Sequence, residues 1–262
     1  MYDPTFYGAD QAVIHDREFG DLARRAAAYL GYLLEEAGLR GGTVVDLGCG
    51  SGILASILTN AGYDVLGIDI SQDMIELASA NAPKASFRRG SLLDADLPSA
   101  VGVTAIGEAL NYATDPRAGL AELERLAARV REALAPGGVF LFDVATPGRH
   151  GPDREALRFH DHDDWTLSMQ ADESADHTRL DRRITIFRKV DGHGPGWYRR
   201  SDEHHVLRLY ELGVITDALA RTGFEATILD AYGSSSRSTP AGGWAVVVAR
   251  PATRSPTTRR SR

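Results

Sequence analysis

The sequence has a single cysteine, Cys49, among its 262 residues, so no disulfide bond can form within the chain. One cysteine is typical of proteins from a reducing compartment. No apolar run approaches the roughly 20 residues that a membrane-spanning helix needs. The first residues, Met1 to Pro4, lack the basic and apolar regions of a secretory signal. We therefore expect a cytoplasmic protein with no membrane partner.

Acidic residues outnumber basic residues in the body of the chain. The net charge is −7, although four arginines lie in residues 251–262, so the remainder is more acidic still. An acidic body is a poor partner for a phosphate backbone, which is bound mainly by Lys and Arg, and we expect no nucleic-acid partner. Residues 251–262 are rich in Ser, Thr, Pro and Arg without apolar periodicity, which predicts a disordered tail.

The first half of the chain alternates between strand and helix patterns. This alternation predicts an α/β domain with a parallel sheet covered by helices on both faces. The predicted strands are residues 43–47, 64–68, 85–89, 102–106 and 139–144. The predicted helices are residues 17–37, 53–61, 72–80 with Ser71 as the N-cap, and 117–134.

The pattern changes after residue 145. Residues 146–163 are rich in Gly, Pro, His and Asp and predict a loop, and three strands at 165–171, 178–189 and 197–209 predict an antiparallel insertion. A helix at 210–222, ended by Gly223, and strands at 225–229 and 244–249 return to the core. We therefore divide the chain into an N-terminal helical lid (1–40), an α/β core (41–145), a β insertion (146–209), the end of the core (210–250) and the tail (251–262).

A glycine-rich turn joins the first core strand to the next helix. Gly48, Gly50 and Gly52 let a ligand approach the backbone closely, and the helix that follows presents free N–H groups to an anionic group. Dinucleotide-binding proteins carry a third glycine one position later, where this chain has Ile53. An NAD(P)-dependent oxidoreductase is therefore the weaker interpretation.

The run Val44-Val45-Asp46-Leu47-Gly48-Cys49-Gly50-Ser51-Gly52 closely resembles the first motif of class I S-adenosylmethionine-dependent methyltransferases. Residues 65–71, 89–94 and 134–138 are similar to that family's later motifs and follow in the same order. The resemblance implies S-adenosylmethionine as the cofactor and a Rossmann-like, mainly parallel seven-stranded sheet. It also implies that the antiparallel insertion after strand five covers a small substrate.

The resemblance assigns cofactor contacts to the ends of the first four strands. The carboxylate of Asp69 is predicted to accept hydrogen bonds from both ribose hydroxyls, each worth about 1.5–3 kcal/mol. Asp46 either binds the amino group of the cofactor or braces the glycine turn. The other predicted cofactor contacts are Gly48, Gly50, Gly52, Ile70, Met74, Ser91, Leu92, Leu93, Glu108 and Tyr7.

The fourth strand ends in Gly107-Glu108-Ala109-Leu110-Asn111-Tyr112, which resembles small-molecule methyltransferases, including the glycine N-methyltransferase-like group. This segment lacks the Asp/Asn-Pro-Pro-aromatic run of nucleobase amino-methyltransferases. Asn111 and Tyr112 are therefore the first substrate-side candidates, and Tyr112 is also a candidate catalytic residue. The alternative for Tyr112 is packing under the next helix.

Two histidines are candidate general bases. Period-two alternation places Glu203, His205, Leu207 and Leu209 on one strand face, and the leucines indicate that this face points inward. His205 beside Glu203 is therefore favoured over its neighbour on the other face, with Glu203 also a substrate-binding candidate. The alternative is a purely structural Glu–His pair.

The N-terminal segment contributes further candidates, since similar enzymes fold such a segment over the cofactor. Tyr7 is expected to face either the sulfonium or the carboxylate of the cofactor, and His15 is either a general base or simply packed. The acidic and histidine-rich run at residues 160–164 predicts a solvated turn, with no metal site.

Together these features predict transfer of a methyl group to a nitrogen or oxygen of a small metabolite. A non-catalytic, S-adenosylmethionine-binding regulatory module is the second interpretation. The sequence leaves the substrate open, and it also leaves open whether the protein is a homodimer.

Overall fold

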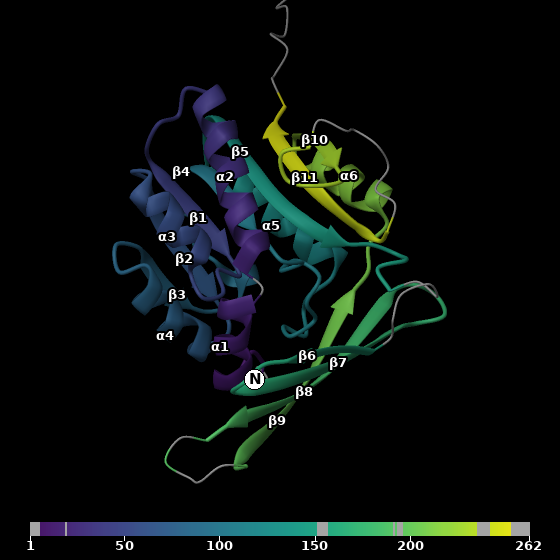
Figure 1. Ribbon diagram of the computed structural model, residues 1–262. Coiled ribbons are helices and arrows are strands. Elements are labelled where there is room, and N and C mark those ends of the chain that lie inside the picture. The colour runs from purple at the N-terminus through teal and green to yellow at the C-terminus, as the bar shows by residue number, and fades with distance from the viewer. Residues whose placement is uncertain are drawn as a thin grey trace, which may run out of the picture.

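The computed structural model describes residues 6–18, 20–150, 157–190, 192, 196–234 and 242–252. The predicted tail therefore lies almost wholly outside the described residues. The chain forms a seven-stranded sheet in the order β10-β11-β5-β4-β1-β2-β3 and a four-stranded sheet in the order β6-β7-β8-β9, and Figure 1 shows the second sheet lying below the first. The predicted α/β class, with a mainly parallel central sheet and an added antiparallel sheet, is confirmed.

The strands of the central sheet are β1 (Thr43–Leu47), β2 (Asp64–Asp69), β3 (Ser86–Arg89), β4 (Ala100–Ala105), β5 (Leu134–Ala145), β10 (Phe224–Leu229) and β11 (Trp244–Pro251). The second sheet consists of β6 (Leu157–Asp161), β7 (Trp165–Glu173), β8 (Arg179–Lys189) and β9 (Tyr198–Arg208). The helices are α1 (Ala9–Glu18), α2 (Gly20–Glu36), α3 (Ile53–Asn60), α4 (Gln72–Asn81), α5 (Leu120–Ala133) and α6 (Leu212–Arg221), with one 3-10 turn at Leu92–Asp94.

Two apolar clusters hold the helices on the central sheet. Leu30 and Leu34 of α2 pack with Leu54 and Leu58 of α3 in one cluster. In the other, α5 and α6 pack against β5 and its neighbours. Because β1, β2 and β4 are parallel, their carboxyl ends lie on the same side of the sheet. Open α/β sheets bind their ligands beyond these carboxyl ends.

Two predicted elements are corrected at the N-terminal end and in the insertion. The single helix expected at residues 17–37 is α2 alone, and a separate helix, α1, precedes it. The loop expected at residues 146–163 contains β6. β6 is an edge strand of five residues, and its two apolar side chains, Leu157 and Phe159, are exposed. Its conformation therefore comes from pairing with β7 rather than from a buried apolar face.

The second sheet has one face toward the core and one toward solvent. Arg182 of β8 pairs with Ala171 of β7 and with His205 of β9. Two residues further along β8, Ile184 pairs with Glu203 of β9. Side chains alternate along a strand, so these residues share a face. That face is largely buried, whereas Arg183, Asp202 and His204 on the other face are exposed.

α1 connects the second sheet to the core. Ile14 of α1 is fully buried in a cluster with Trp165, Leu167, Ile184 and Ile186 on the inner face of the sheet. No helix in the described part of the chain is long and apolar enough to span a membrane.

Candidate active site

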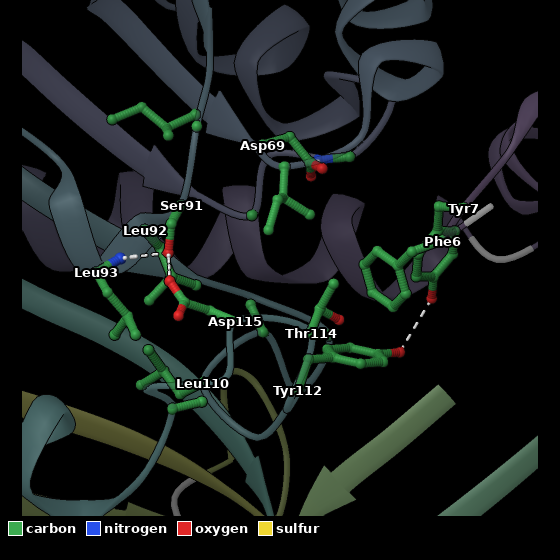
Figure 2. A pocket seen from close by; sticks show the side chains of 18 of the residues that line it. Phe6, Tyr7, Asp69, Ser91, Leu92, Leu93, Leu110, Tyr112, Thr114 and Asp115 are labelled. Carbon is green, nitrogen blue, oxygen red and sulfur yellow. Dashed lines mark hydrogen bonds between the residues drawn. The ribbon is translucent and has the colours of Figure 1, made fainter. Parts of the chain in front are cut away.

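A cavity of about 950 Å³, counting its open mouth, lies at the carboxyl ends of β1, β2 and β4. Figure 2 shows several of the side chains that line it. The predicted site residues that line the cavity are Tyr7, His15, Gly48, Gly50, Asp69, Ile70, Met74, Ser91, Leu92, Leu93 and Tyr112.

Asp69 fixes the glycine turn against the end of β2. Its carboxylate accepts hydrogen bonds from the backbone N–H of Gly50 and of Ser71, both at 2.9 Å. Gly50 has a φ of +52°, and a Cβ there would meet no atom within 4 Å, so the backbone borders open space. Lone pairs of the carboxylate that are not used by these two N–H groups can accept from a ligand in the cavity.

Gly52 and Asp46, also predicted as cofactor contacts, do not line the cavity. A Cβ on Gly52 would lie 3.0 Å from Ala78 of α4, so this glycine allows two helices to approach closely. Asp46 is buried behind the turn and accepts a hydrogen bond of 2.7 Å from Thr104. Burial raises the pKa of Asp46 to about 7. Its position fits the bracing interpretation.

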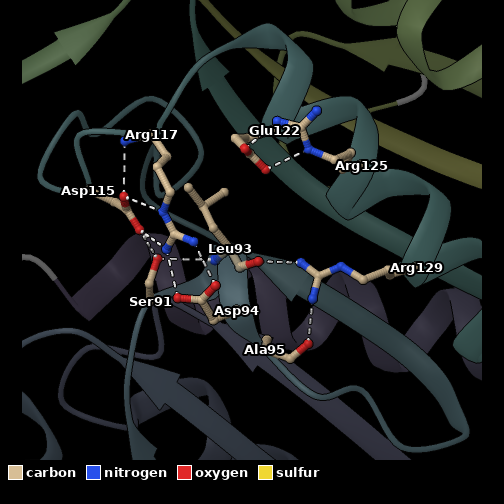
Figure 3. A network of polar contacts seen from close by, with 9 residues as sticks. All are labelled: Ser91, Leu93, Asp94, Ala95, Asp115, Arg117, Glu122, Arg125 and Arg129. Atoms are coloured by element: carbon tan, nitrogen blue, oxygen red, sulfur yellow. Dashed lines mark hydrogen bonds and ion pairs between the residues drawn. The ribbon is translucent and has the colours of Figure 1, made fainter.

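A polar network shapes one end of the cavity (Figure 3). Ser91 donates to Asp115 at 2.6 Å and accepts from the N–H of Leu93 at 3.2 Å. Arg117 donates to both Asp115 and Asp94 and holds the pKa of each carboxyl below its usual range. The sequence analysis missed Asp115, because only the folded chain brings it to Ser91, 24 positions away.

Aromatic rings from the N-terminal segment close the other end of the cavity. The hydroxyls of Tyr7 and Tyr112 are 3.0 Å apart, and Phe6 lies edge-on to Tyr112 with ring centroids separated by 5.2 Å (Figure 2). His15 contacts Tyr7 with centroids 5.3 Å apart. Phe6 was missed in the sequence, where nothing distinguishes it from a packing residue.

Glu203 holds this N-terminal segment in place. Its carboxylate accepts from the N–H of Tyr7 and of Gly8, both at 2.9 Å, and contacts Nε2 of His205 at 2.7 Å. Ser71 adds a hydrogen bond of 2.8 Å to the carbonyl of Tyr7. These bonds hold Tyr7 at its φ of +46°, which is unfavourable for a residue with a side chain.

The inward orientation expected for Glu203 and His205 is therefore present, but neither residue lines the cavity. The expected substrate contact of Glu203 is replaced by contacts with the N-terminal segment. His205 lies behind the aromatic rings, with its centroid 4.7 Å from Phe6 and 4.8 Å from Tyr7. It supports these rings from outside the cavity.

Glu108 and Asn111 are also placed away from the cavity. Glu108 is buried and forms ion pairs with Arg149 and, at 2.7 Å, with Arg182. The amide of Asn111 bonds to the backbone of Ala145 and Arg208, which joins the core to the second sheet. Their position at the end of β4 was predicted correctly, but the left-handed turn at Glu108, with a φ of +62°, decides where the side chains point.

His15, Tyr7 and Tyr112, which line the cavity, are poor proton acceptors at pH 7. Burial, with a further contribution from the charge of His205, lowers the pKa of His15 to about 4. Burial raises the pKa of both Tyr7 and Tyr112. Within the described ranges, no group of three or more His, Cys, Asp or Glu side chains is arranged to hold a metal ion.

Residues 45–142 match the sequence profile of a family described as "Methyltransferase domain". The chain carries a methyltransferase domain. The match covers the strands and the glycine turn that build the cavity, so the predicted class, an S-adenosylmethionine-dependent methyltransferase, and its cofactor are confirmed.

Two named relatives are similar in sequence to this methyltransferase. A protein of Geobacillus sp. (strain WCH70), named as a methyltransferase, is 27% identical to this chain over 198 residues. The match covers 71% of this chain and 74% of that protein. A ubiquinone biosynthesis O-methyltransferase of Methylococcus capsulatus is 33% identical over 120 residues, 43% of this chain and 47% of that enzyme. The match thus spans about half the length of the O-methyltransferase.

Two solved structures are similar over nearly the whole chain, including the second sheet. An S-adenosylmethionine-dependent methyltransferase from Clostridium acetobutylicum has a TM-score of 0.78 at 18% identity and covers 93% of this chain and 98% of its own. A sugar N-methyltransferase from Streptoalloteichus sp. has a TM-score of 0.70 at 19% identity and covers 90% and 91%. At these identities the likeness shows the fold.

Proposed function

We propose that the methyltransferase transfers a methyl group from S-adenosylmethionine to an amine nitrogen of a small metabolite. The observation that carries the proposal is the aromatic enclosure of Phe6, Tyr7 and Tyr112 at one end of a cavity whose other end is polar. Aromatic faces attract a cation by about 0.5–2 kcal/mol, which suits the charged end of the cofactor.

The cavity fits S-adenosylmethionine in two further places. Asp69 presents a carboxylate beside an open glycine backbone, where ribose hydroxyls can donate. Ser91 and Asp115, with Leu92 and Leu93, form a slot with one polar wall for the adenine. The bound cofactor supplies an activated methyl group, so the protein's task is to align the acceptor, and alignment alone saves about 7–11 kcal/mol.

The poor basicity of His15, Tyr7 and Tyr112 favours nitrogen as the acceptor. A neutral amine attacks with its own lone pair and releases its proton afterwards, whereas a hydroxyl needs a base during attack. With a pKa of about 4, His15 is neutral at pH 7 but a poor proton acceptor. The structural likeness to a sugar N-methyltransferase is in keeping with nitrogen. Oxygen is the second candidate, because a curated relative is an O-methyltransferase.

The test is transfer of labelled methyl from S-adenosylmethionine into a size-fractionated extract of the source cells. We expect label in the low-mass fraction. Asp69→Ala should lose most of that label, because losing two charge-assisted hydrogen bonds weakens cofactor binding by roughly 100-fold or more. Acylating the amines of the extract beforehand should abolish labelling.

The outcomes separate the candidates. Label that persists after acylation assigns the acceptor as oxygen. Label found only in protein or nucleic acid contradicts the small-molecule proposal. Cofactor binding without transfer to any fraction would favour the regulatory module.

A further inference from the structure

A second, smaller cavity lies beneath the second sheet, outside the cofactor site. It measures about 320 Å³ with its opening and is lined by Arg149, His150, Arg158, Met169, Ala171, Leu180 and Arg182. Arg158, Met169, Ala171 and Arg182 belong to the inner face of the sheet, and Arg149 and His150 belong to the chain that follows β5. The cavity therefore lies between the core and its cover.

Positive charge predominates in this small cavity. Three arginines line it, and the carboxylates that touch its lining residues are Glu108, which pairs with Arg149 and Arg182, and Glu173, which accepts from the N–H of His150. Glu173 is also engaged by the N–H of Gly148 and by His177. Among the described residues, the arginines thus outnumber these carboxylates by three to two, and Arg149 and Arg182 share the single carboxylate of Glu108.

Arg158 and Arg182 differ in how they are held. Arg182 is largely buried, with a side chain 14% exposed, and is fixed by its ion pair with Glu108. Arg158 is exposed, and no carboxylate among the described residues forms an ion pair with it. A fixed and a free guanidinium on one sheet face resemble the paired donors with which proteins bind phosphate and carboxylate groups.

Arg182 lies close to both cavities. It lines the small cavity, and its charge acts on Tyr112 and Tyr7, which line the large one. A molecule whose reacting atom lies beside Tyr112 is therefore close to the guanidinium of Arg182, which belongs to the second sheet.

We propose that the small cavity binds an anionic group of the methyl acceptor, a phosphate or a carboxylate, held by Arg158, Arg182 and Arg149. The inference rests on the proposed function and narrows it: the acceptor is a small amine that also carries an anionic group. Glu108 positions two of the arginines, and Arg158 completes the site when the anion is bound.

The first test uses simple anions as probes. Inorganic phosphate and acetate are titrated into the protein saturated with S-adenosylhomocysteine. We expect at least one of them to bind, and Arg158→Gln to weaken that binding about tenfold, in the range of one charge-assisted contact. Arg183→Gln, on the outer face of β8, is the matched control and should leave binding unchanged. No binding of either anion, or equal binding by Arg158→Gln, overturns the assignment.

The second test keeps the site separate from the proposed function. The labelled low-mass product is passed over an anion exchanger, and we expect it to be retained. Phosphatase treatment that abolishes retention identifies a phosphate monoester, and retention that is lost only after carboxylates are esterified identifies a carboxylate. A labelled product that is not retained overturns the anion site while leaving methyl transfer to a small amine intact.

Discussion

Asp46 and Asp69 are buried carboxylates at the ends of neighbouring strands, and their surroundings give them different tasks. Asp69 lines the cavity, and burial raises its pKa, while the two backbone N–H groups that it accepts oppose this rise. Asp46 lies behind the turn with one hydroxyl partner, and its pKa is raised to about 7 by burial. The charge near the cofactor is therefore carried mainly by Asp69.

Replacing Asp46 with Asn should stabilise the protein at high pH. The folded pKa of about 7 lies above the unfolded value, near 3.9. Between these values the folded state keeps a proton that the unfolded state releases, so stability falls as pH rises toward 7. Asp46→Asn removes this loss and should raise the free energy of unfolding at pH 8, on the order of a few kcal/mol.

Urea unfolding of the cofactor-free protein at pH 8 and pH 5 measures this difference. The gain should be larger at pH 8, because Asp46 is then ionised in the native protein. A gain of equal size at both values, or a loss at pH 8, would show that the folded pKa is not raised.

At the residue scale, sequence motifs predict what is local and miss what the fold assembles. Gly50 and Asp69 belong to ordered motifs and were found. Asp115 and Phe6 reach the cavity through contacts with distant residues and carry no signal of their own. Glu108 was assigned to the cofactor because a carboxylate at a strand end is typical of such contacts, but Arg149 and Arg182 engage it.

At the scale of elements, α1 and the segment before it depend on β9. Glu203 accepts two N–H groups from the turn before α1, and Ile14 anchors the helix in the apolar cluster of the second sheet. The aromatic enclosure is thus held by the insertion as well as by Ser71 of the core. Sequence alternation predicted the inward face of β9, but it does not show what that face touches.

Substituting Glu203 with Gln should loosen this closure without unfolding the sheet. A glutamine amide accepts through one oxygen only, so one of the two N–H bonds from Tyr7 and Gly8 is lost. We expect faster hydrogen exchange at these two amides and a KM for S-adenosylmethionine raised several-fold, in line with the loss of about 1 kcal/mol. Asp202→Asn, on the exposed face of β9, is the control.

If Glu203 only stabilised the fold and did not hold the N-terminal segment over the cofactor, the result would differ. In that case Glu203→Gln would lower the thermal stability but leave both the KM and the exchange of the N-terminal amides at the values of Asp202→Asn.

At the scale of the whole molecule, the second sheet lies below the central sheet (Figure 1). The order of strands and helices in the core follows from its alternating pattern, and so does the antiparallel insertion. The docking of one sheet on the other does not follow, because it depends on contacts such as Asn111 with Arg208 and Tyr112 with Leu207, each far apart in sequence. The small cavity depends on that docking, whereas the residues that line the large cavity belong to the N-terminal segment and the core.

The direction of the cofactor in the large cavity is the central claim, and a crystal structure with S-adenosylhomocysteine tests it most directly. We predict that both ribose hydroxyls lie within hydrogen-bond distance of the Asp69 carboxylate, with the adenine between Leu92 and Ser91. The sulfur should face the hydroxyls of Tyr7 and Tyr112. A sulfur that points toward the network of Ser91 and Asp115, or a cofactor bound outside this cavity, would contradict the account.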